Sequence, residues 1–202
     1  MRRLLLPPRQ GEPDDYMADF EAIAAAQPDG FFWVGDHVYI DSLAPMAFEY
    51  EYQLQRSVPS AQAMLNSVPQ WAIWDDHDYG EDDAGADYPM KDESRRQFCD
   101  FWGESADSVR RTRDGIYAAN MFGPAGQRVQ VILLDTRYFR GPLVKRTGIP
   151  PHEPGEGYAG QYLPNNDPEA TMLGPQQWKW LAEQLRVPAE VRILGSSIQL
   201  IA

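Results

Sequence analysis

The stretch Trp71-Ala72-Ile73-Trp74-Asp75-Asp76-His77-Asp78-Tyr79-Gly80 sets the expectation for the fold. Its first four residues are apolar and predict a buried strand, and three carboxylates with one imidazole follow directly. Acidic groups packed this tightly cost free energy unless a cation lies among them, because they repel one another. Carboxylate oxygens beside a histidine suit a divalent or trivalent metal, whereas the alternative interpretation is an acidic surface loop.

A second segment with the same design favours the metal interpretation. Residues 31–41 read Phe-Phe-Trp-Val-Gly-Asp-His-Val-Tyr-Ile-Asp, so another apolar run of strand length stops at a carboxylate, Asp36. If the two strands are neighbours in a parallel sheet, Asp36 and Asp76 meet at the carboxyl edge, where open α/β sheets place their ligands. Asp36 could then bridge two metals and Asp76 could bind one of them, as in a two-metal phosphoester hydrolase.

Length and composition limit the classes of function. The 202 residues suit one domain, so we expect a single domain over residues 1–202, and 43% hydrophobic residues suffice for a substantial core. The net charge of −12 argues against binding to nucleic-acid backbones, since phosphate contacts need clustered Lys and Arg. A small phosphorylated substrate is not excluded, because bound metals would invert the local field. The oligomeric state stays open.

The sequence also carries information on compartment. The single cysteine, Cys99, excludes an intrachain disulfide, and no apolar stretch is long enough to span a membrane. The apolar part of residues 1–6 is too short for a signal peptide. As written, the chain is expected to be cytoplasmic, and an extracytoplasmic location is the alternative if the native N-terminus lies upstream.

Hydrophobic periodicity predicts alternating helices and strands. We expect helices over 14–27, 47–55, 91–103 and 174–186, and strands over 31–34, 71–74, 129–134, 191–194 and 197–201. In the last helix Trp178, Leu181 and Leu185 form the apolar face. The alternation predicts an α/β fold with a sheet covered on both faces. Residues 141–166 are rich in Pro and Gly, as is typical of a functional flap or a disordered segment.

Five motifs, taken together and in order, carry a resemblance to a known family. They are Gly35-Asp36-His37-Val38-Tyr39, Trp74-Asp75-Asp76-His77-Asp78-Tyr79-Gly80, Leu134-Asp135-Thr136-Arg137-Tyr138-Phe139-Arg140, Leu173-Gly174-Pro175-Gln176-Gln177-Trp178, and residues 191–199 ending in Ser196-Ser197-Ile198-Gln199. The chain resembles the PhoD-like alkaline phosphatases, within the calcineurin-like metallophosphoesterases. The resemblance implies a four-layer α/β-β-α sandwich. It also implies a metal-dependent phosphoric ester hydrolase, acting on monoesters or diesters with metal-activated water.

The resemblance also assigns roles to five residues of this chain. Asp36 would bridge the metals, Tyr39 would bind iron, and Asp76 would be a further metal ligand. His77 would contact the substrate phosphate or protonate the leaving oxygen, and Arg137 would lie near the phosphate. The metals implied are iron with calcium, and the partner implied is a phosphate-ester substrate.

The remaining polar residues of these motifs receive supporting roles or stay ambiguous. We expect Asp75 and Asp78 to orient the ligands, since a packed acidic cluster needs such partners. His37 is expected to support the site or to lie in a loop, and His152 to be solvated. Arg140 could bind phosphate, because its planar fork suits that group, or form an ion pair with Asp135.

The chain departs from the family pattern at both ends. Relatives begin with a strand ending in Ser-Cys, whose cysteine binds metal, and they supply further ligands in a Ser-Gly-Asp-x-His segment. Neither feature occurs in this sequence, which stops at Ala202. We therefore expect an incomplete sandwich, the central part of a phosphatase truncated at both ends. The alternative is an inactive pseudo-phosphatase kept as a structural or binding fragment.

Overall fold

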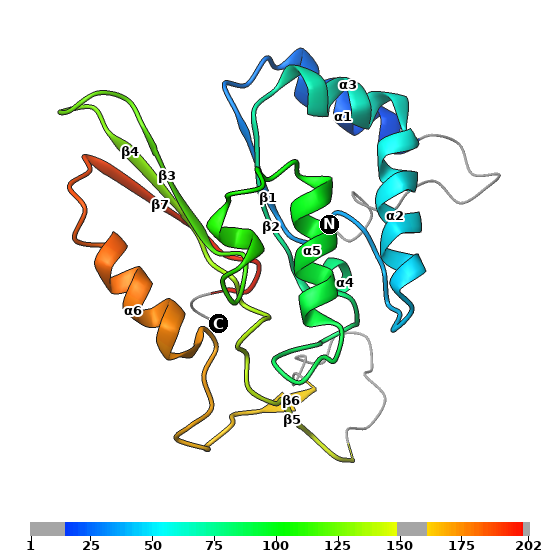
Figure 1. The fold of residues 1–202 in the computed structure, drawn as a ribbon, viewed down its shortest axis with the longest axis vertical. Helices are drawn as coiled ribbons and strands as arrows, with labels where there is room; N and C mark the ends of the chain where they lie inside the picture. Colours follow the sequence, from blue (N-terminus) through cyan, green and yellow to red (C-terminus); the bar gives the residue numbers. More distant parts are fainter. Residues whose placement is uncertain (1–14, 149–160, 200–202) are drawn as a thin grey trace, which may run out of the picture.

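The structure is a computed structural model that describes residues 15–148 and 161–199. Its strands form two principal sheets and one short ribbon (Figure 1). The two-stranded sheet pairs β1 (Phe31–Val34) in parallel with β2 (Gln70–Ile73). The second sheet has the order β3-β4-β7, with β4 antiparallel to β3 and parallel to β7. The bounds are β3 Ala118–Phe122, β4 Val129–Leu133 and β7 Val191–Gly195, and the ribbon pairs β5 (Val144–Lys145) with β6 (Tyr162–Leu163).

The helices surround these sheets and begin in ways their sequences explain. Pro45 and Pro59 lie in the first turns of their helices, where proline costs no hydrogen bond. The helical elements are α1 Asp15–Ala25, α2 Pro45–Ser57, α3 Pro59–Ser67, α4 Asp76–Tyr79, α5 Lys91–Phe101, the 3-10 turn η1 Val109–Arg111, and α6 Gly174–Gln184. Within the part of the chain described, none of the helices is both long and apolar enough to cross a membrane.

The two principal sheets pack face to face through aromatic side chains. The ring of Phe122 on β3 lies 6.4 Å from that of Phe32 on β1 and 4.9 Å from that of Trp71 on β2. Because successive side chains of a strand point to opposite faces, Trp33 points away and contacts Trp102, 5.6 Å distant, at the end of α5. The two-stranded sheet is thus covered by the other sheet on one face and by helices on the other.

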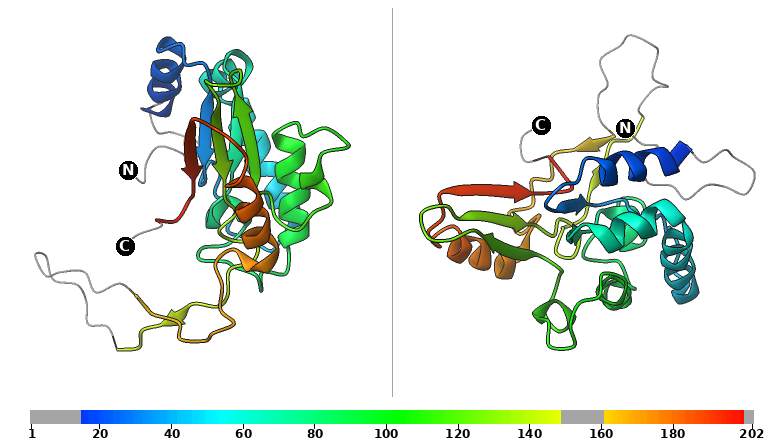
Figure 2. Two further views of the ribbon diagram at one scale, coloured as in Figure 1. Left: turned by 90° about the vertical axis from the view of Figure 1, so that its left-hand side faces the viewer. Right: turned by 90° about the horizontal axis from the view of Figure 1, so that it is seen from above.

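Strand β4 shows the same alternation on the other side of the sandwich. Val131 and Leu133 belong to the core that contains β1 and β2, whereas Ile132 packs with Leu173 and with Leu181 of α6. The layers therefore run from α6 through the two sheets to the remaining helices, and Figures 1 and 2 show the same order. The predicted α/β class is confirmed, with the two sheets between helical layers.

Several predicted elements differ from the observed ones. Strand β3 and helix α3 had no prediction, and the strand predicted over 197–201 is wrong for residues 197–199. There the chain turns, and the Ser197 hydroxyl donates to Asp75 Oδ1 at 2.7 Å. In α6, Leu181 is buried, but Trp178 and Leu185 are 53% and 44% exposed, because α6 is an outer layer that touches only one sheet.

The parallel pairing of β1 and β2 determines where the acidic turns lie. Both strands run in one direction and in matched register, so the turns that follow them leave the sheet at the same edge. Two backbone hydrogen bonds join these turns, from Ile40 N to His77 O (3.0 Å) and from Ser42 N to Gly80 O (2.9 Å). The condition under which Asp36 and Asp76 were expected to meet, two neighbouring parallel strands, is therefore fulfilled.

Candidate metal centre

The backbone at Gly35 and Asp36 lets the two turns approach closely. A Cβ on Gly35 would lie 2.4 Å from Cβ of Asp75, and Gly35 has φ +114°, so only glycine fits there. Asp36 follows with φ +55°, a left-handed conformation that Asp and Asn tolerate better than other side chains. The Gly-Asp pair therefore places a carboxylate against the second acidic turn.

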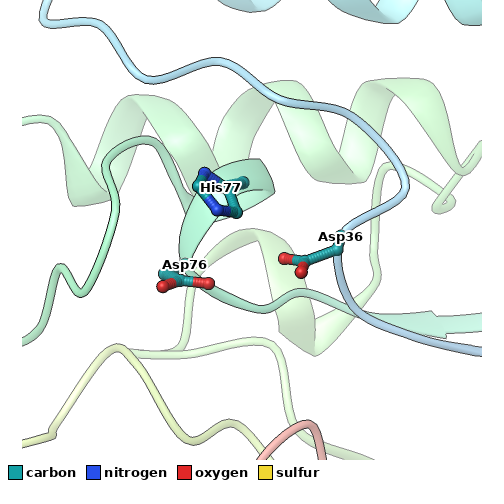
Figure 3. Close-up of side chains that lie close together, drawn as sticks. All are labelled: Asp36, Asp76 and His77. Carbon is teal, nitrogen blue, oxygen red and sulfur yellow. The ribbon is translucent and has the colours of Figure 1, made fainter. Parts of the chain in front are cut away.

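Two groups of side chains that could hold a metal ion lie at these turns. Ligand atoms of Asp36, Asp76 and His77 all lie within 4.8 Å of one another, and the two carboxylates point toward each other (Figure 3). A second group with the same spacing consists of Asp76, Asp82 and Asp83. Asp76 belongs to both groups, whereas the sequence predicted the shared role for Asp36. Together the groups could hold two cations side by side.

The acidic groups open into a cavity of about 660 Å³. All five residues predicted as metal ligands or catalytic groups line it, so the structure brings the whole predicted set together. The lining residues are Asp36, Tyr39, Asp75, Asp76, His77, Asp82, Asp83, Arg137, Gln161, Ser197, Ile198 and Gln199. This size is within the usual range for small-molecule sites.

Asp36 is the residue whose surroundings call most clearly for a cation. Its Oδ1 is buried without a hydrogen-bond partner among the described residues, and Oδ2 accepts only a long 3.5 Å bond from the Tyr39 hydroxyl. Burial, together with the negative charges of Asp78, Asp75 and Asp76, raises the pKa of Asp36 to about 7. An unpartnered oxygen among hard oxygen donors fits a bound metal ion, which would satisfy it and offset the charge.

Tyr39 and His77 pack against each other on the side of the cavity next to Asp36. Their ring centroids are 4.2 Å apart. Burial and the neighbouring Asp36 raise the pKa of the Tyr39 phenol to about 12. The phenol is therefore protonated at neutral pH unless a cation stabilises the phenolate.

His77 is held by Asp41, a residue for which no role was predicted. Its Nδ1 lies 2.7 Å and 2.9 Å from the two carboxylate oxygens of Asp41. Burial lowers the pKa of His77, but the hydrogen bond and charge of Asp41 raise it by more, so the net shift is upward. Asp41 could have been recognised as a candidate from the sequence, since it is the last residue of the acidic segment that contains Asp36. His77 thus has its Nδ1 engaged by Asp41, while its Nε2 lies 3.8 Å from Asp82 Oδ1 at the cavity.

Arg137 supplies positive charge on the opposite side of the cluster. Its Nε donates to Asp75 Oδ1 at 2.6 Å, and its Nη2 lies 3.6 Å from Asp76 Oδ1. Burial raises the pKa of Asp76, but the charge of Arg137 and the backbone N–H of Asp83 outweigh it, so the net shift is downward. Burial raises the pKa of Asp75 despite its bonds to Arg137 and Ser197. Asp75 therefore positions Arg137, in line with the supporting role predicted for it.

The ion pair with Asp135, one of the two alternatives for Arg140, is wrong. The Arg140 guanidinium donates to the Asp83 carbonyl, and Arg140 is not among the residues that line the cavity. Asp135 is fully buried and accepts hydrogen bonds from the Trp74 indole and from the backbone of Ile116, Arg137 and Tyr138. The carboxylate at the end of β4 thus stabilises a turn. His152 lies outside the described residues.

The long segment over 141–166, for which a functional flap and a disordered segment were the alternatives, reaches the cavity in its described part. Gln161, next to β6, lines the cavity, and the Tyr162 hydroxyl donates to the Asp83 carboxylate. Asp83 has φ +58°, so this carboxylate is presented by a left-handed turn. The ribbon of β5 and β6 therefore borders the second acidic group.

In metal-free protein, Asp36 is expected to make stability fall with rising pH. The pKa of Asp36 is about 7 in the folded chain, against an ordinary value of 3.8. Its contribution to the free energy of unfolding is therefore complete below about pH 4 and is lost as the pH rises through 7. The Asp36→Asn variant lacks this loss. The measured quantity is the unfolding free energy of Asp36→Asn minus that of the unsubstituted chain, both with a chelator present. This difference should rise by on the order of 1–2 kcal/mol between pH 4.5 and 8, allowing for solvent screening. Urea unfolding measures this; an equal difference at both pH values contradicts it.

Comparison with known proteins identifies the class to which this fold and cavity belong. The sequence profile of the PhoD-like phosphatases matches residues 9–201, and the chain belongs to this family. A solved structure of PhoD is similar with a TM-score of 0.64 and 16% sequence identity, which shows the shared fold. The similarity covers 88% of this chain and 38% of that structure, so the chain spans well under half of its length. Among curated proteins, none matches this chain.

Proposed function

We propose that this chain is a metal-dependent phosphoric ester hydrolase domain of the PhoD type, acting on phosphomonoesters or diesters. The observation that carries the proposal is the approach of Asp36 and Asp76, whose carboxylate oxygens lie within 4.8 Å of each other and of a ring nitrogen of His77, with a buried oxygen on Asp36 that has no partner among the described residues. Arg137 faces the same 660 Å³ cavity, so an anion-binding group lies beside the cation-binding groups. Family membership supports phosphate-ester chemistry.

The described residues divide naturally between two cations, for which the family resemblance suggests iron and calcium. Asp36, Tyr39 and Asp76 would hold the first, and Asp76 with Asp82 and Asp83 would hold the second. When bound, such ions acidify water and polarise phosphoryl oxygens as Lewis acids. A phenolate ligand suits a trivalent ion, while an all-carboxylate group suits calcium.

The protein's own residues bind the substrate and handle the proton. Arg137 is positioned to bind a phosphoryl oxygen, since its guanidinium is fixed by Asp75 and lines the cavity. His77 is positioned to give a proton to the leaving oxygen, because Asp41 favours its protonated form and holds the ring by Nδ1. Asp41 therefore has the role of orienting the acid.

The proposal is tested by metal content together with hydrolysis. The purified chain is loaded with iron and calcium, analysed for bound elements, and assayed with p-nitrophenyl phosphate and bis(p-nitrophenyl) phosphate. Bound metal and chelator-sensitive hydrolysis of either ester are expected. A chain that binds no metal and hydrolyses neither ester would refute the proposal and favour the inactive binding fragment.

The same assay separates the proton donor from the metal ligands. His77→Gln should keep its bound metal and lose more activity toward phenyl phosphate than toward p-nitrophenyl phosphate, because the better leaving group needs no proton. A loss on the order of 10²-fold for phenyl phosphate is typical of removing a general acid. Loss of metal in His77→Gln would instead place His77 among the ligands.

A further inference from the structure

Behind the candidate metal centre lies a buried pair of polar residues that the proposed chemistry does not use. His37 Nδ1 lies 2.5 Å from Asp78 Oδ2, and the two side chains are 1% and 0% exposed. The contact has the distance of an ion pair but not the alignment of a hydrogen bond. Buried polar groups of this kind cost free energy, so their presence beside the cavity calls for an explanation.

The surroundings of His37 fix the orientation of its ring. Its Nε2 is buried and has no hydrogen-bond partner among residues 15–148 and 161–199. Aromatic rings enclose it instead, with centroids between 5.1 Å and 6.2 Å from the imidazole. They belong to Trp33, Tyr52, Phe98, Phe101 and Trp102. A ring packed on several sides cannot turn freely, so the position of its one polar contact among the described residues, to Asp78, is fixed.

Asp78 makes its second contact within its own acidic turn. Its Oδ1 accepts a 2.5 Å hydrogen bond from the backbone N–H of Asp75, which closes the turn that presents Asp76. His37 follows Asp36 directly in the sequence. The Asp78 carboxylate thus contacts both His37, which follows the candidate ligand Asp36, and Asp75, which precedes the candidate ligand Asp76. The connection spans the gap across which Gly35 and Asp75 approach each other.

We propose that the His37–Asp78 pair is a positioning device that sets the spacing between the two metal-binding turns. It acts through Asp36 and Asp76 and touches neither substrate nor metal. The aromatic rings hold His37 in a fixed position. Asp78, which contacts both His37 and Asp75, fixes the position of the Asp75–Asp76 turn relative to it. Only the consequence for metal binding rests on the proposed function; the mechanical role does not.

Hydrogen exchange in the metal-free, folded chain tests the mechanical role directly. The amides of Ile40 and Ser42 report on the contact between the turns, since they donate to His77 O and Gly80 O. In Asp78→Asn we expect both to exchange at least about tenfold faster, while the Val131 and Leu133 amides of β4 stay within about twofold. Unchanged exchange at Ile40 and Ser42, or equal acceleration at all four amides, would overturn the proposal.

Matched variants at His37 separate the polar contact from aromatic packing. His37→Phe keeps an aromatic ring and loses the contact, so it should behave like Asp78→Asn. His37→Asn places an amide nitrogen near the position of Nδ1 and should exchange more like the unsubstituted chain. If His37→Phe exchanges like the unsubstituted chain, packing alone holds the turns and the proposal is wrong. Should that variant not fold, the comparison of His37→Asn with Asp78→Asn still decides.

Metal binding gives a second readout that a purely structural role would not change. Loss of a partner that orients metal ligands typically weakens metal affinity by about 10- to 100-fold, and we expect this for iron in folded Asp78→Asn. A visible phenolate-to-iron(III) absorption band should weaken or shift in parallel. If the unsubstituted chain binds no iron while exchange responds as expected, the proposed function fails and the positioning role stands. If it binds iron but exchange and affinity are unchanged in Asp78→Asn, the positioning role fails alone.

Discussion

Asp36→Asn is expected to abolish tight metal binding and, with it, phosphate-ester hydrolysis. The variant replaces a carboxylate, whose Oδ1 has no hydrogen-bond partner among the described residues, by a neutral amide of the same size. The loss of iron affinity should exceed the roughly 10- to 100-fold that accompanies removal of a partner that only orients ligands. Isothermal titration with iron and elemental analysis after desalting measure it.

The fold should survive this substitution, which makes the result interpretable. Asn tolerates the left-handed φ of +55° as well as Asp does, and it removes charge from a crowded acidic cluster. Asp29→Asn is the matched control, because Asp29 is exposed and lies at the opposite end of β1. Retention of full metal affinity and activity in Asp36→Asn would remove Asp36 from the metal centre.

Arg137→Gln is expected to weaken both the fold and catalysis. The guanidinium is buried and is the cation that contacts Asp75 and Asp76, so its removal leaves buried negative charge without compensation. Breaking a buried pair in this way costs about 3–5 kcal/mol, and we expect a loss near the lower figure because Asp75 also accepts from Ser197. Urea unfolding of the metal-free chain at pH 7 measures it.

Adding metal should partly restore the stability of Arg137→Gln without restoring its activity. Bound cations would offset the acidic charge, whereas the planar donors for a phosphoryl oxygen would still be missing. Arg186→Gln is the control for removal of one positive charge, because Arg186 is exposed and lies just beyond the end of α6. An Arg137→Gln variant that is as stable and as active as the Arg186→Gln control would show that Arg137 neither compensates the cluster nor binds phosphate.

The local character of the candidate site was predictable because strand ends and tight turns are encoded locally. Two apolar runs, each stopping at an acidic turn, predicted β1 and β2, whereas the parallel pairing that brings Asp36 and Asp76 together entered only as a condition. Gly35 before Asp36 marks a backbone that only glycine can adopt, and this is a property of the turn itself. The roles of Tyr39 and Arg137 came from family resemblance, and the structure places both in the cavity that Asp36 and Asp76 also line.

Sequence patterns failed where an element depends on its neighbours. Strand β3 has only partly buried or exposed side chains, so its residues lack a clear alternation, and it exists because it pairs with β4. Residues 197–201 were predicted to form a strand. In the structure, the Ser197 hydroxyl instead donates a hydrogen bond to the carboxylate of Asp75, 122 positions earlier in the sequence. The partners of Arg140 were likewise decided by the Asp83 loop and not by the adjacent Asp135.

By itself, the sequence determined the α/β class, the acidic turns and the candidate ligands, because hydrophobic periodicity and turn chemistry act over a few residues. Only the tertiary structure decided which groups work together. Asp41 orients His77 across 36 positions, and Asp75 holds Arg137 across 62. The pKa of Asp36 rises to about 7 only when burial and three other carboxylates surround it. Charge interactions depend on distance in space, and that distance is fixed by the packing of the two sheets and not by the order of residues.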